Sequence, residues 1–560
     1  MAVALGVMAL GVMALAVSAP VVQLAGAQGP RGAGPDARTP ASGTLRVGFA
    51  ATWTRNSEAY ENGVLLPIGD RYTTLSLGPE AIRNLQPIED AARLAAGLPD
   101  FGASLGAIQT GARSRFESTP LGVEYGVTSR FALGAVVPFV TSVSRVDVAA
   151  NASAATATVG WNPALTSESI VAANQQLLSQ FDAASTSLSQ RIAECLASPG
   201  AAGCGAIVAA PAAAQSLVAE SQSFANAIAA LYGGRSGSAG APFIPLAGSP
   251  AQAAITARLA GFKTQFAAFG GAPLTAAAPV GAPAPMTGAQ FQQLLSDSLY
   301  GIVANPLIPV VRRGIGDIDL TAAYTWHDSY APARADAPWR ENIWWRSALV
   351  GVFRLGSGAA AEAADLIAVA VGDHQNDIEV RSISDVGVGR FSLTSSLRYT
   401  VQSATDVSVR VPPMPRDPYP ESFRTLAARR VPGNELAIEI FPRWTPSEAM
   451  SVAAFYGYRS KGEATWSGTS VATGLDGSTV NLNAAILGSD TAEREHRFGA
   501  SIAYSSLDAW KRGQARWPVE VAISHYQTTA GSGGTVPKLV HDDVQIRWYI
   551  RLLGRGEPRR

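Results

Sequence analysis

Apolar and polar residues alternate strictly in many short segments of the chain. In residues 44–53, for example, Leu45, Val47, Phe49 and Trp53 share one parity, and the other parity holds small or charged residues. A two-residue period of this kind predicts β-strands with one apolar face. We count twelve such segments, at 44–53, 121–127, 131–139, 318–326, 345–353, 378–389, 391–401, 436–444, 450–458, 498–504, 519–523 and 544–552.

The polar faces of these strands distinguish a soluble β-sandwich from a membrane barrel. A sandwich exposes its polar face to water, whereas a barrel encloses that face in a lumen. Charged residues make up only 15% of the chain, and tryptophans cluster near the strand ends, as in the interfacial girdles of barrels. We therefore predict an all-β transmembrane, up-and-down antiparallel β-barrel of about 12 strands, with 14 as the alternative. Its location is the bacterial outer membrane, with outer-membrane lipid around it.

The charged residues on the polar strand faces are the candidate lumen-lining residues. They either select polar solutes through a transverse field or neutralise one another across neighbouring strands, and the near balance of acids and bases favours the second reading. The candidates are Arg46, Glu124, Asp317, Asp319, Arg346, Arg354, Arg398, Glu435, Glu439, Arg443, Arg459, Arg497, Glu520, Arg547 and Arg551.

The chain begins with an apolar stretch that carries no charge and is followed by Ala25-Gly26-Ala27, a small-residue cleavage site. This pattern predicts a secretory signal peptide over residues 1–27, although no Lys or Arg precedes the apolar core; a retained transmembrane helix is the alternative. Export to an oxidising compartment favours a disulfide between Cys195 and Cys204 over two unpaired thiols.

Short and long connections alternate between the predicted strands, as in an up-and-down barrel with short periplasmic turns. The longest connection contains Ala-rich segments with helical spacing and predicts helices over 169–232, 251–268 and 287–304, while 80–98 is also helical in pattern. This insert caps the mouth, plugs the lumen or projects outward. The predicted organisation is a signal peptide at 1–27, strands 1–3 with a long first loop at 43–147, a helical insert at 148–313, strands 4–12 at 314–553 and a tail at 554–560.

Three stretches resemble a known family. They are TPLGVEYGVTSRFALGAVVPFV (119–140), GIGDIDL (314–320) and VGDHQNDIE (371–379). In their order and spacing the chain resembles the outer-membrane transporter-like barrels called "MetA-pathway of phenol degradation" proteins, which are distantly similar to long-chain fatty-acid channels. Its insert is longer than the usual loop of that family. The resemblance implies uptake or export of small, often hydrophobic or aromatic compounds, and it implies no catalytic residue.

Other function classes find little support in the composition. The net charge of zero argues against nucleic-acid binding, and neither a phosphate-binding loop nor a metal motif is present, so we expect no cofactor and no metal. The pair His327 and Ser329 has the spacing of outer-membrane phospholipases, but no orienting partner can be assigned, and we expect no enzyme.

We therefore predict a passive outer-membrane channel for small-molecule solutes. The alternative is a non-transporting outer-membrane anchor whose helical insert binds a ligand or partner.

Overall fold

The computed structural model describes residues 36–152, 156–330, 340–367, 369–415, 417–475 and 477–552. The predicted signal peptide and the tail at 554–560 lie outside the described residues. The chain divides into a barrel unit (Met1–Arg71, Gly111–Asp147 and Gly301–Arg560) and a helical unit (Tyr72–Thr110 and Val148–Tyr300). The helical unit therefore includes most of the long first loop, and residues 301–313, which we had placed in the insert, belong to the barrel unit.

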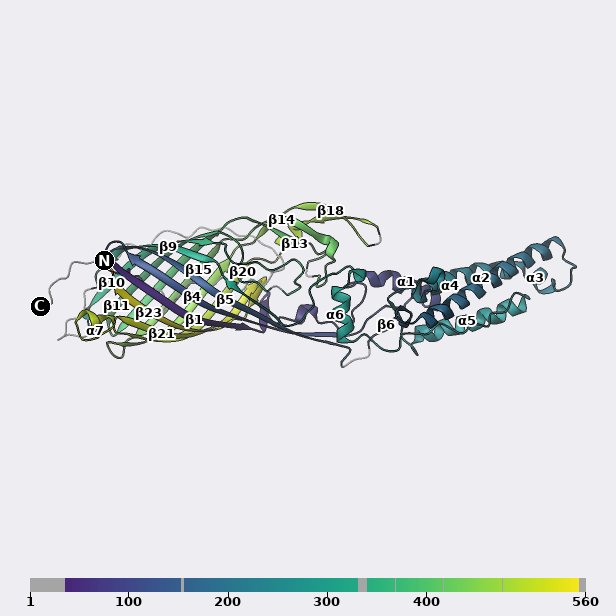
Figure 1. The fold of residues 1–560 in the computed structure, drawn as a ribbon, viewed down its shortest axis with the longest axis horizontal. Helices are drawn as coiled ribbons and strands as arrows, with labels where there is room; N and C mark the ends of the chain where they lie inside the picture. The colour runs from purple at the N-terminus through teal and green to yellow at the C-terminus, as the bar shows by residue number, and fades with distance from the viewer. Residues whose placement is uncertain are drawn as a thin grey trace. The chain divides into compact units, whose positions relative to one another are not determined.

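Twelve antiparallel strands of the described residues form a closed ring in the barrel unit, inclined as Figure 1 shows. The ring closes because β4 pairs with both β1 and β5. This confirms the twelve predicted strands and excludes the alternative of fourteen. In ring order the strands are β4 (Ile108–Gly126), β1 (Thr44–Asn56), β23 (Val540–Arg551), β21 (Val519–Gly533), β20 (Glu493–Ser505), β16 (Met450–Lys461), β15 (Glu435–Trp444), β12 (Phe391–Gln402), β11 (Asp377–Gly389), β10 (Arg340–Leu355), β9 (Ile318–Asp328) and β5 (Phe131–Ala150).

The apolar parity of each strand forms the outer wall of the barrel. Phe49 and Leu121 lie opposite each other on β1 and β4, and both are more than 40% exposed, as is Ile523 on β21. Inward-facing charged residues such as Arg398 and Glu439 are buried. An apolar exterior around a polar interior is stable only where lipid surrounds the barrel, and closed barrels of this kind span outer membranes. The protein is thus an outer-membrane β-barrel.

The two ends of the barrel differ in their connections. One end, the short-turn end, holds the tight turns after β4, β11 and β15, the start of β1, and an edge-to-face contact between Trp326 and Trp345 with ring centroids 5.1 Å apart. Short additional elements of the barrel unit lie in the other connections. They are β2 (Glu58–Glu61), β3 (Val64–Pro67), β8 (Val310–Ile315), β13 (Thr405–Arg410), β14 (Thr425–Val431), β17 (Thr465–Ser467), β18 (Thr469–Thr473), β19 (Thr479–Asn483), β22 (Thr535–Pro537) and, at the short-turn end, α7 (Leu507–Lys511).

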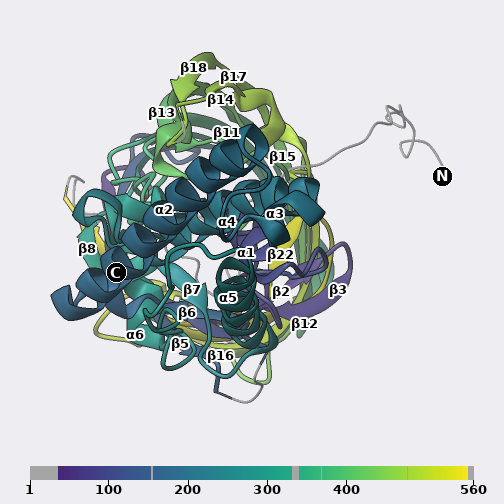
Figure 2. The ribbon, with the colours of Figure 1, turned by 90° about the vertical axis from the view of Figure 1, so that its right-hand side faces the viewer.

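The core of the helical unit is built from three long helices. The helices α2 and α4 run alongside each other (Figures 1 and 2), and Phe181, Phe224 and Phe262 from α2, α4 and α5 meet with ring centroids 5.1–5.7 Å apart. Among the described residues, no helix is long and apolar enough to cross a membrane. The elements are α1 (Gln86–Ala96), β6 (Val159–Trp161), α2 (Glu168–Ala197), α3 (Gly205–Ala209), α4 (Pro211–Tyr232), β7 (Phe243–Pro245), α5 (Pro250–Ala268) and α6 (Gly288–Ser296).

Two details of the helical unit bear on the sequence predictions. The predicted disulfide is present, and it joins Cys195 in the last turn of α2 to Cys204 just before α3. The helix predicted over 287–304 is shorter: Thr287 caps its start through a capping box with Gln290, but α6 ends at Ser296 because Asp297 adopts an extended conformation. The prediction for its C-terminal half was therefore wrong.

Candidate functional site

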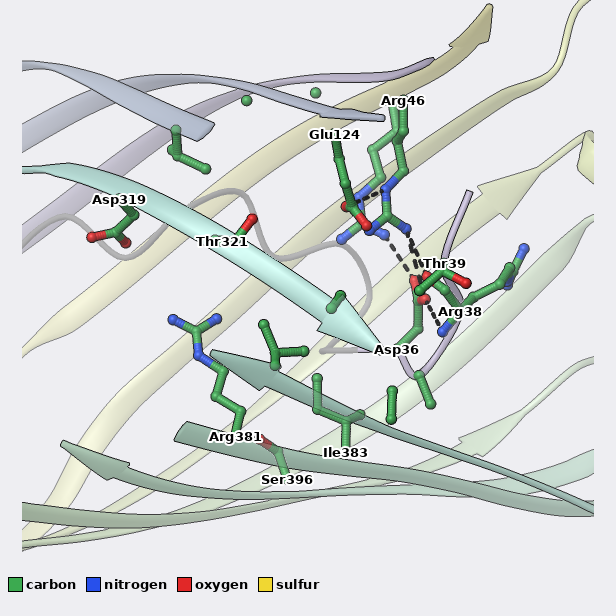
Figure 3. A pocket seen from close by; sticks show the side chains of 18 of the residues that line it. Asp36, Arg38, Thr39, Arg46, Glu124, Asp319, Thr321, Arg381, Ile383 and Ser396 are labelled. Atoms are coloured by element: carbon green, nitrogen blue, oxygen red, sulfur yellow. Dashed lines mark hydrogen bonds and ion pairs between the residues drawn. The ribbon is translucent and has the colours of Figure 1, made fainter. Parts of the chain in front are cut away.

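The barrel holds a partly open cavity of about 160 Å³, lined by charged, small and apolar side chains. Nine of the twelve ring strands contribute to its lining, so the cavity is the lumen itself rather than a surface groove. Arg46 and Arg381 line it from different strands, and Asp36 and Arg38 lie close to Arg46 (Figure 3).

Residues 36–39, which we call the N-terminal segment, lie inside the lumen just ahead of β1. Arg547 Nη1 donates to the carboxylate of Asp36 at 2.9 Å, and the backbone N–H of Ala37 donates to Asp385 Oδ2 at 3.0 Å. The Thr325 hydroxyl donates to the carbonyl oxygen of Ala37, also at 3.0 Å. Contacts with β9, β11 and β23 thus hold one short stretch of backbone inside the barrel, toward the short-turn end.

Both charged side chains of the N-terminal segment, Asp36 and Arg38, form ion pairs with residues of the barrel wall. Arg46 Nη1 lies 3.8 Å from Asp36 Oδ1 and donates to the carbonyl oxygen of Arg38 at 3.2 Å, while its other nitrogens donate to Glu124. The Arg38 guanidinium lies 3.4 Å from Glu520 Oε1. Residues 36–39 lack the alternation that marks strands, so no prediction for this segment follows from the sequence. The signal that remains is the pair of opposite charges two positions apart, Asp36 and Arg38.

A network of alternating charges covers the wall between β11 and β20. Arg398 bridges Glu379 at 3.9 Å and Glu439 at 3.4 Å. Arg459 contacts three carboxylates, those of Glu435, Glu493 and Glu495, at 2.9, 3.2 and 3.4 Å. The register places most of these partners directly or diagonally across neighbouring strands. Such pairing offsets the cost of burying each charge.

The structure places most lumen-lining candidates on the inner wall, with two departures. Asp317 precedes β9, and its carboxylate accepts the N–H groups of Gly358 and Asp373 at 2.8 and 3.1 Å, so it fastens a loop rather than lining the wall. Arg551 ends β23 and is exposed. Whether the candidates select solutes stays a prediction. The inner-wall candidates are Arg46, Glu124, Asp319, Arg346, Arg354, Arg398, Glu435, Glu439, Arg443, Arg459, Arg497, Glu520 and Arg547.

The loop that Asp317 fastens, residues 356–376, folds inward at the end of the barrel opposite the short turns. Val371 is buried against Phe116 of β4 and Val140 of β5, whose side chains lie on the inner parity of their strands. The Ser357 hydroxyl also donates to the carbonyl oxygen of Gly316 at 2.8 Å. We call this segment the inner loop; it narrows the lumen from the long-loop end.

A second cavity, of about 190 Å³, lies toward the short-turn end. Its lining includes Tyr330, Arg346 and Arg443, and Arg346 lies over the Tyr330 ring at 4.6 Å. Asp36 and Arg38 line both this cavity and the first one, and also a smaller one of about 100 Å³. The N-terminal segment, and not the barrel wall, therefore separates these cavities from one another.

The pair considered as an enzymatic alternative takes part in packing at the short-turn end. The Ser329 hydroxyl donates to the carbonyl oxygen of Trp345 at 2.9 Å and accepts the N–H of the same residue, while the His327 ring packs on the Trp345 indole with centroids 4.5 Å apart. Asp328 pairs with Arg346 at 3.0 Å. Within the part of the chain that the structure describes, no three His, Cys, Asp or Glu side chains gather as a metal site.

No family model and no curated protein matches the sequence. The structure is similar to an outer-membrane channel from Pseudomonas putida F1, with 8% identity and a TM-score of 0.38 over 92% of this chain and 98% of that one. It is also similar to the translocator domain of the autotransporter NalP from Neisseria meningitidis (7% identity, TM-score 0.27, 90% and 88% covered) and to a Pseudomonas aeruginosa FadL homologue (10%, 0.25, 96% and 100%).

Proposed function

We propose that the protein is an outer-membrane channel through which small molecules cross by passive diffusion. The observation that carries this proposal is the content of the lumen, which holds cavities lined by charged side chains on both sides of the N-terminal segment rather than one continuous close-packed apolar core. Hydrogen bonds and ion pairs hold that segment, and water or a solute can replace such contacts. A barrel that served only as an anchor needs no such space.

Aromatic side chains on the inner wall support aromatic compounds as one class of solute. The rings of Phe441 and Phe455 lie 4.9 Å apart, and Phe455 lies 5.3 Å from Tyr526, which stacks on His541 at 4.1 Å. The four rings follow the wall from β15 to β23. A Cβ at Gly457 would lie 2.7 Å from Phe455 Cζ, so this glycine leaves the room that the ring needs. Rings at this spacing give flat solutes surfaces on which to stack.

A second candidate function, that of a non-transporting anchor, is favoured by the dense ion pairing between β11 and β20. If Arg398 and Arg459 hold their carboxylates without interruption, that half of the lumen is sealed by side chains. The two functions differ in whether loosening the N-terminal segment opens a path for ions.

Conductance of the full-length protein in planar bilayers tests the proposal. We expect discrete current steps in potassium chloride, and larger or more frequent steps when Asp36→Ala and Arg38→Ala are combined, because both ion-paired side chains of the N-terminal segment are then removed. The matched control combines Arg55→Gln with Asp542→Asn, an exposed ion pair at 2.8 Å on the outer wall. If the folded wild type and the folded double variant both stay silent, the channel fails and the anchor stands.

A further inference from the structure

The N-terminal segment occupies the lumen in the way that a bound ligand would. Its carboxylate meets Arg547 and Arg46, its backbone N–H meets Asp385 and its carbonyl oxygen meets Thr325. The partners come from four strands that are distant in sequence, β23, β1, β11 and β9. Each of these wall residues presents a polar group to the same small region, and together they form a site that the chain fills with its own residues.

The strongest contact in this site is made to an anion. Arg547 Nη1 lies 2.9 Å from the Asp36 carboxylate, while its distance to the wall carboxylate of Glu520 is 3.9 Å. Arg547 thus has its closer partner in the segment and only a distant one in the wall. Charge-assisted hydrogen bonds of guanidinium to carboxylate are among the strongest in proteins.

The cation of the same segment is held less tightly. Arg38 lies 3.4 Å from Glu520, and its side chain is 31% exposed against 13% for Asp36. Withdrawal of the segment therefore costs Arg547 its close partner, and an incoming anion restores that contact.

From this geometry we infer that the lumen binds small organic carboxylates at Arg547 and Arg46, and that such a solute takes the place of the Asp36 carboxylate. The inference rests on the proposed function, because it assigns a class of solute to the channel. It also gives the N-terminal segment a role as a competing internal ligand. Solute entry and segment release are then one exchange, in which one carboxylate replaces another on the same arginines.

Calorimetric titration of the full-length protein with benzoate, and with benzamide as its neutral isostere, tests this inference. We expect saturable binding of benzoate and none of benzamide. Asp36→Ala removes the internal competitor and should tighten benzoate binding about tenfold, the factor expected for one lost charge-assisted contact. Arg547→Gln should weaken it by a similar factor, and the control Arg55→Gln on the outer wall should leave it unchanged.

Equal binding of both compounds, or benzoate binding that does not tighten in Asp36→Ala, overturns the inference. The second of these results remains decisive if Arg547→Gln fails to fold. Because calorimetry detects binding whether or not ions flow, its outcome is separate from the conductance test. Current steps without benzoate binding refute the solute class alone, whereas benzoate binding without current refutes the channel.

Discussion

Asp36 and Arg547 are separated by 511 positions in the chain, yet Arg547 Nη1 donates to the Asp36 carboxylate at 2.9 Å inside the barrel. The first described residue of the protein is thereby bound to the last strand of the ring. This contact belongs to a set in which wall residues from four strands hold the N-terminal segment. Whether the N-terminal segment occupies the lumen thus depends on a few contacts, and each contact can be removed by a single substitution.

Thr325→Val should loosen the N-terminal segment, because it removes the hydroxyl that donates to the carbonyl oxygen of Ala37. Loss of one such hydrogen bond is worth about 1 kcal/mol, or about fivefold in the fraction of time that the segment is released. Ala37→Cys reports this release: Ala37 is 1% exposed, and the two native cysteines are already bonded to each other.

We expect maleimide to label that cysteine about fivefold faster in the Thr325→Val background. The control is Ser347→Ala, which removes a hydroxyl that hydrogen-bonds Ser384 on the barrel wall instead. Equal labelling rates with and without Thr325 would show that its hydroxyl does not hold the segment.

Ile523→Arg tests the assignment of the outer wall to lipid. Ile523 is 59% exposed on β21, and an arginine in the apolar band costs about 2–4 kcal/mol near the membrane midplane. Val471→Arg in β18, outside the ring and 67% exposed, should leave the free energy of unfolding nearly unchanged. Urea titration of both variants refolded into lipid vesicles measures the difference, and equal losses would contradict a lipid-facing position for Ile523.

Arg459→Met should destabilise the barrel strongly. The substitution leaves the carboxylates of Glu435, Glu493 and Glu495 together without their shared cation, and loss of one partner from a buried network costs about 3–5 kcal/mol. Arg55→Met breaks an exposed pair with Asp542 and should cost at most about 1 kcal/mol.

Urea unfolding of these two variants gives the comparison. Adding Glu493→Gln to Arg459→Met should recover part of the loss, because one of the crowded carboxylates is then neutral, whereas Glu495 is also held by Arg497 at 2.6 Å. A loss in Arg459→Met as small as that in Arg55→Met would mean that the network contributes little to stability.

The inner loop should be held more firmly in acid than in base. Burial, and next the neighbouring Asp373, raise the pKa of Asp317 to about 7. In the unfolded chain the Asp317 carboxyl ionises near its ordinary pKa. The stability that the raised pKa gives the folded state is therefore complete only below that ordinary pKa, and it is lost as the pH rises to about 7. Asp317 accepts the N–H groups of Gly358 and Asp373, which report its state directly.

Hydrogen exchange of these two amides, corrected for the intrinsic rate, should show greater protection at about pH 6 than at about pH 8. Asp317→Asn does not titrate, and the difference between the two conditions should vanish in that variant. Protection that increases with pH in the wild type would contradict this prediction.

The barrel could be predicted from the sequence because its signal is local. Each strand alternates within its own ten or so residues, and Phe49 or Ile523 is outward-facing by parity alone. The inward orientation of Arg46 and Glu124 also follows from parity, whereas their pairing depends on the register of the two strands, which the structure supplies.

The contents of the lumen could not be predicted, because they depend on contacts between distant segments. Asp36 and Val371 belong to stretches in which apolar and polar residues do not alternate regularly, and nothing near either residue indicates that it enters the barrel. For the same reason the sequence placed residues 72–110 in a barrel loop, whereas they pack with the helices. The end of α6 was missed because a single extended residue, Asp297, outweighs helical spacing beyond it.

The position of the N-terminal segment also constrains the order of folding. Ala37 lies seven residues ahead of β1, yet its partners Thr325 and Asp385 lie on β9 and β11, and Arg547, the partner of Asp36, lies on β23, the last strand of the ring in sequence. These contacts span hundreds of residues, so the loop-closure entropy must be lost before any of them forms. The contacts of the N-terminal segment with Asp385 and Arg547 therefore depend on strands far apart in the sequence having come together in the ring.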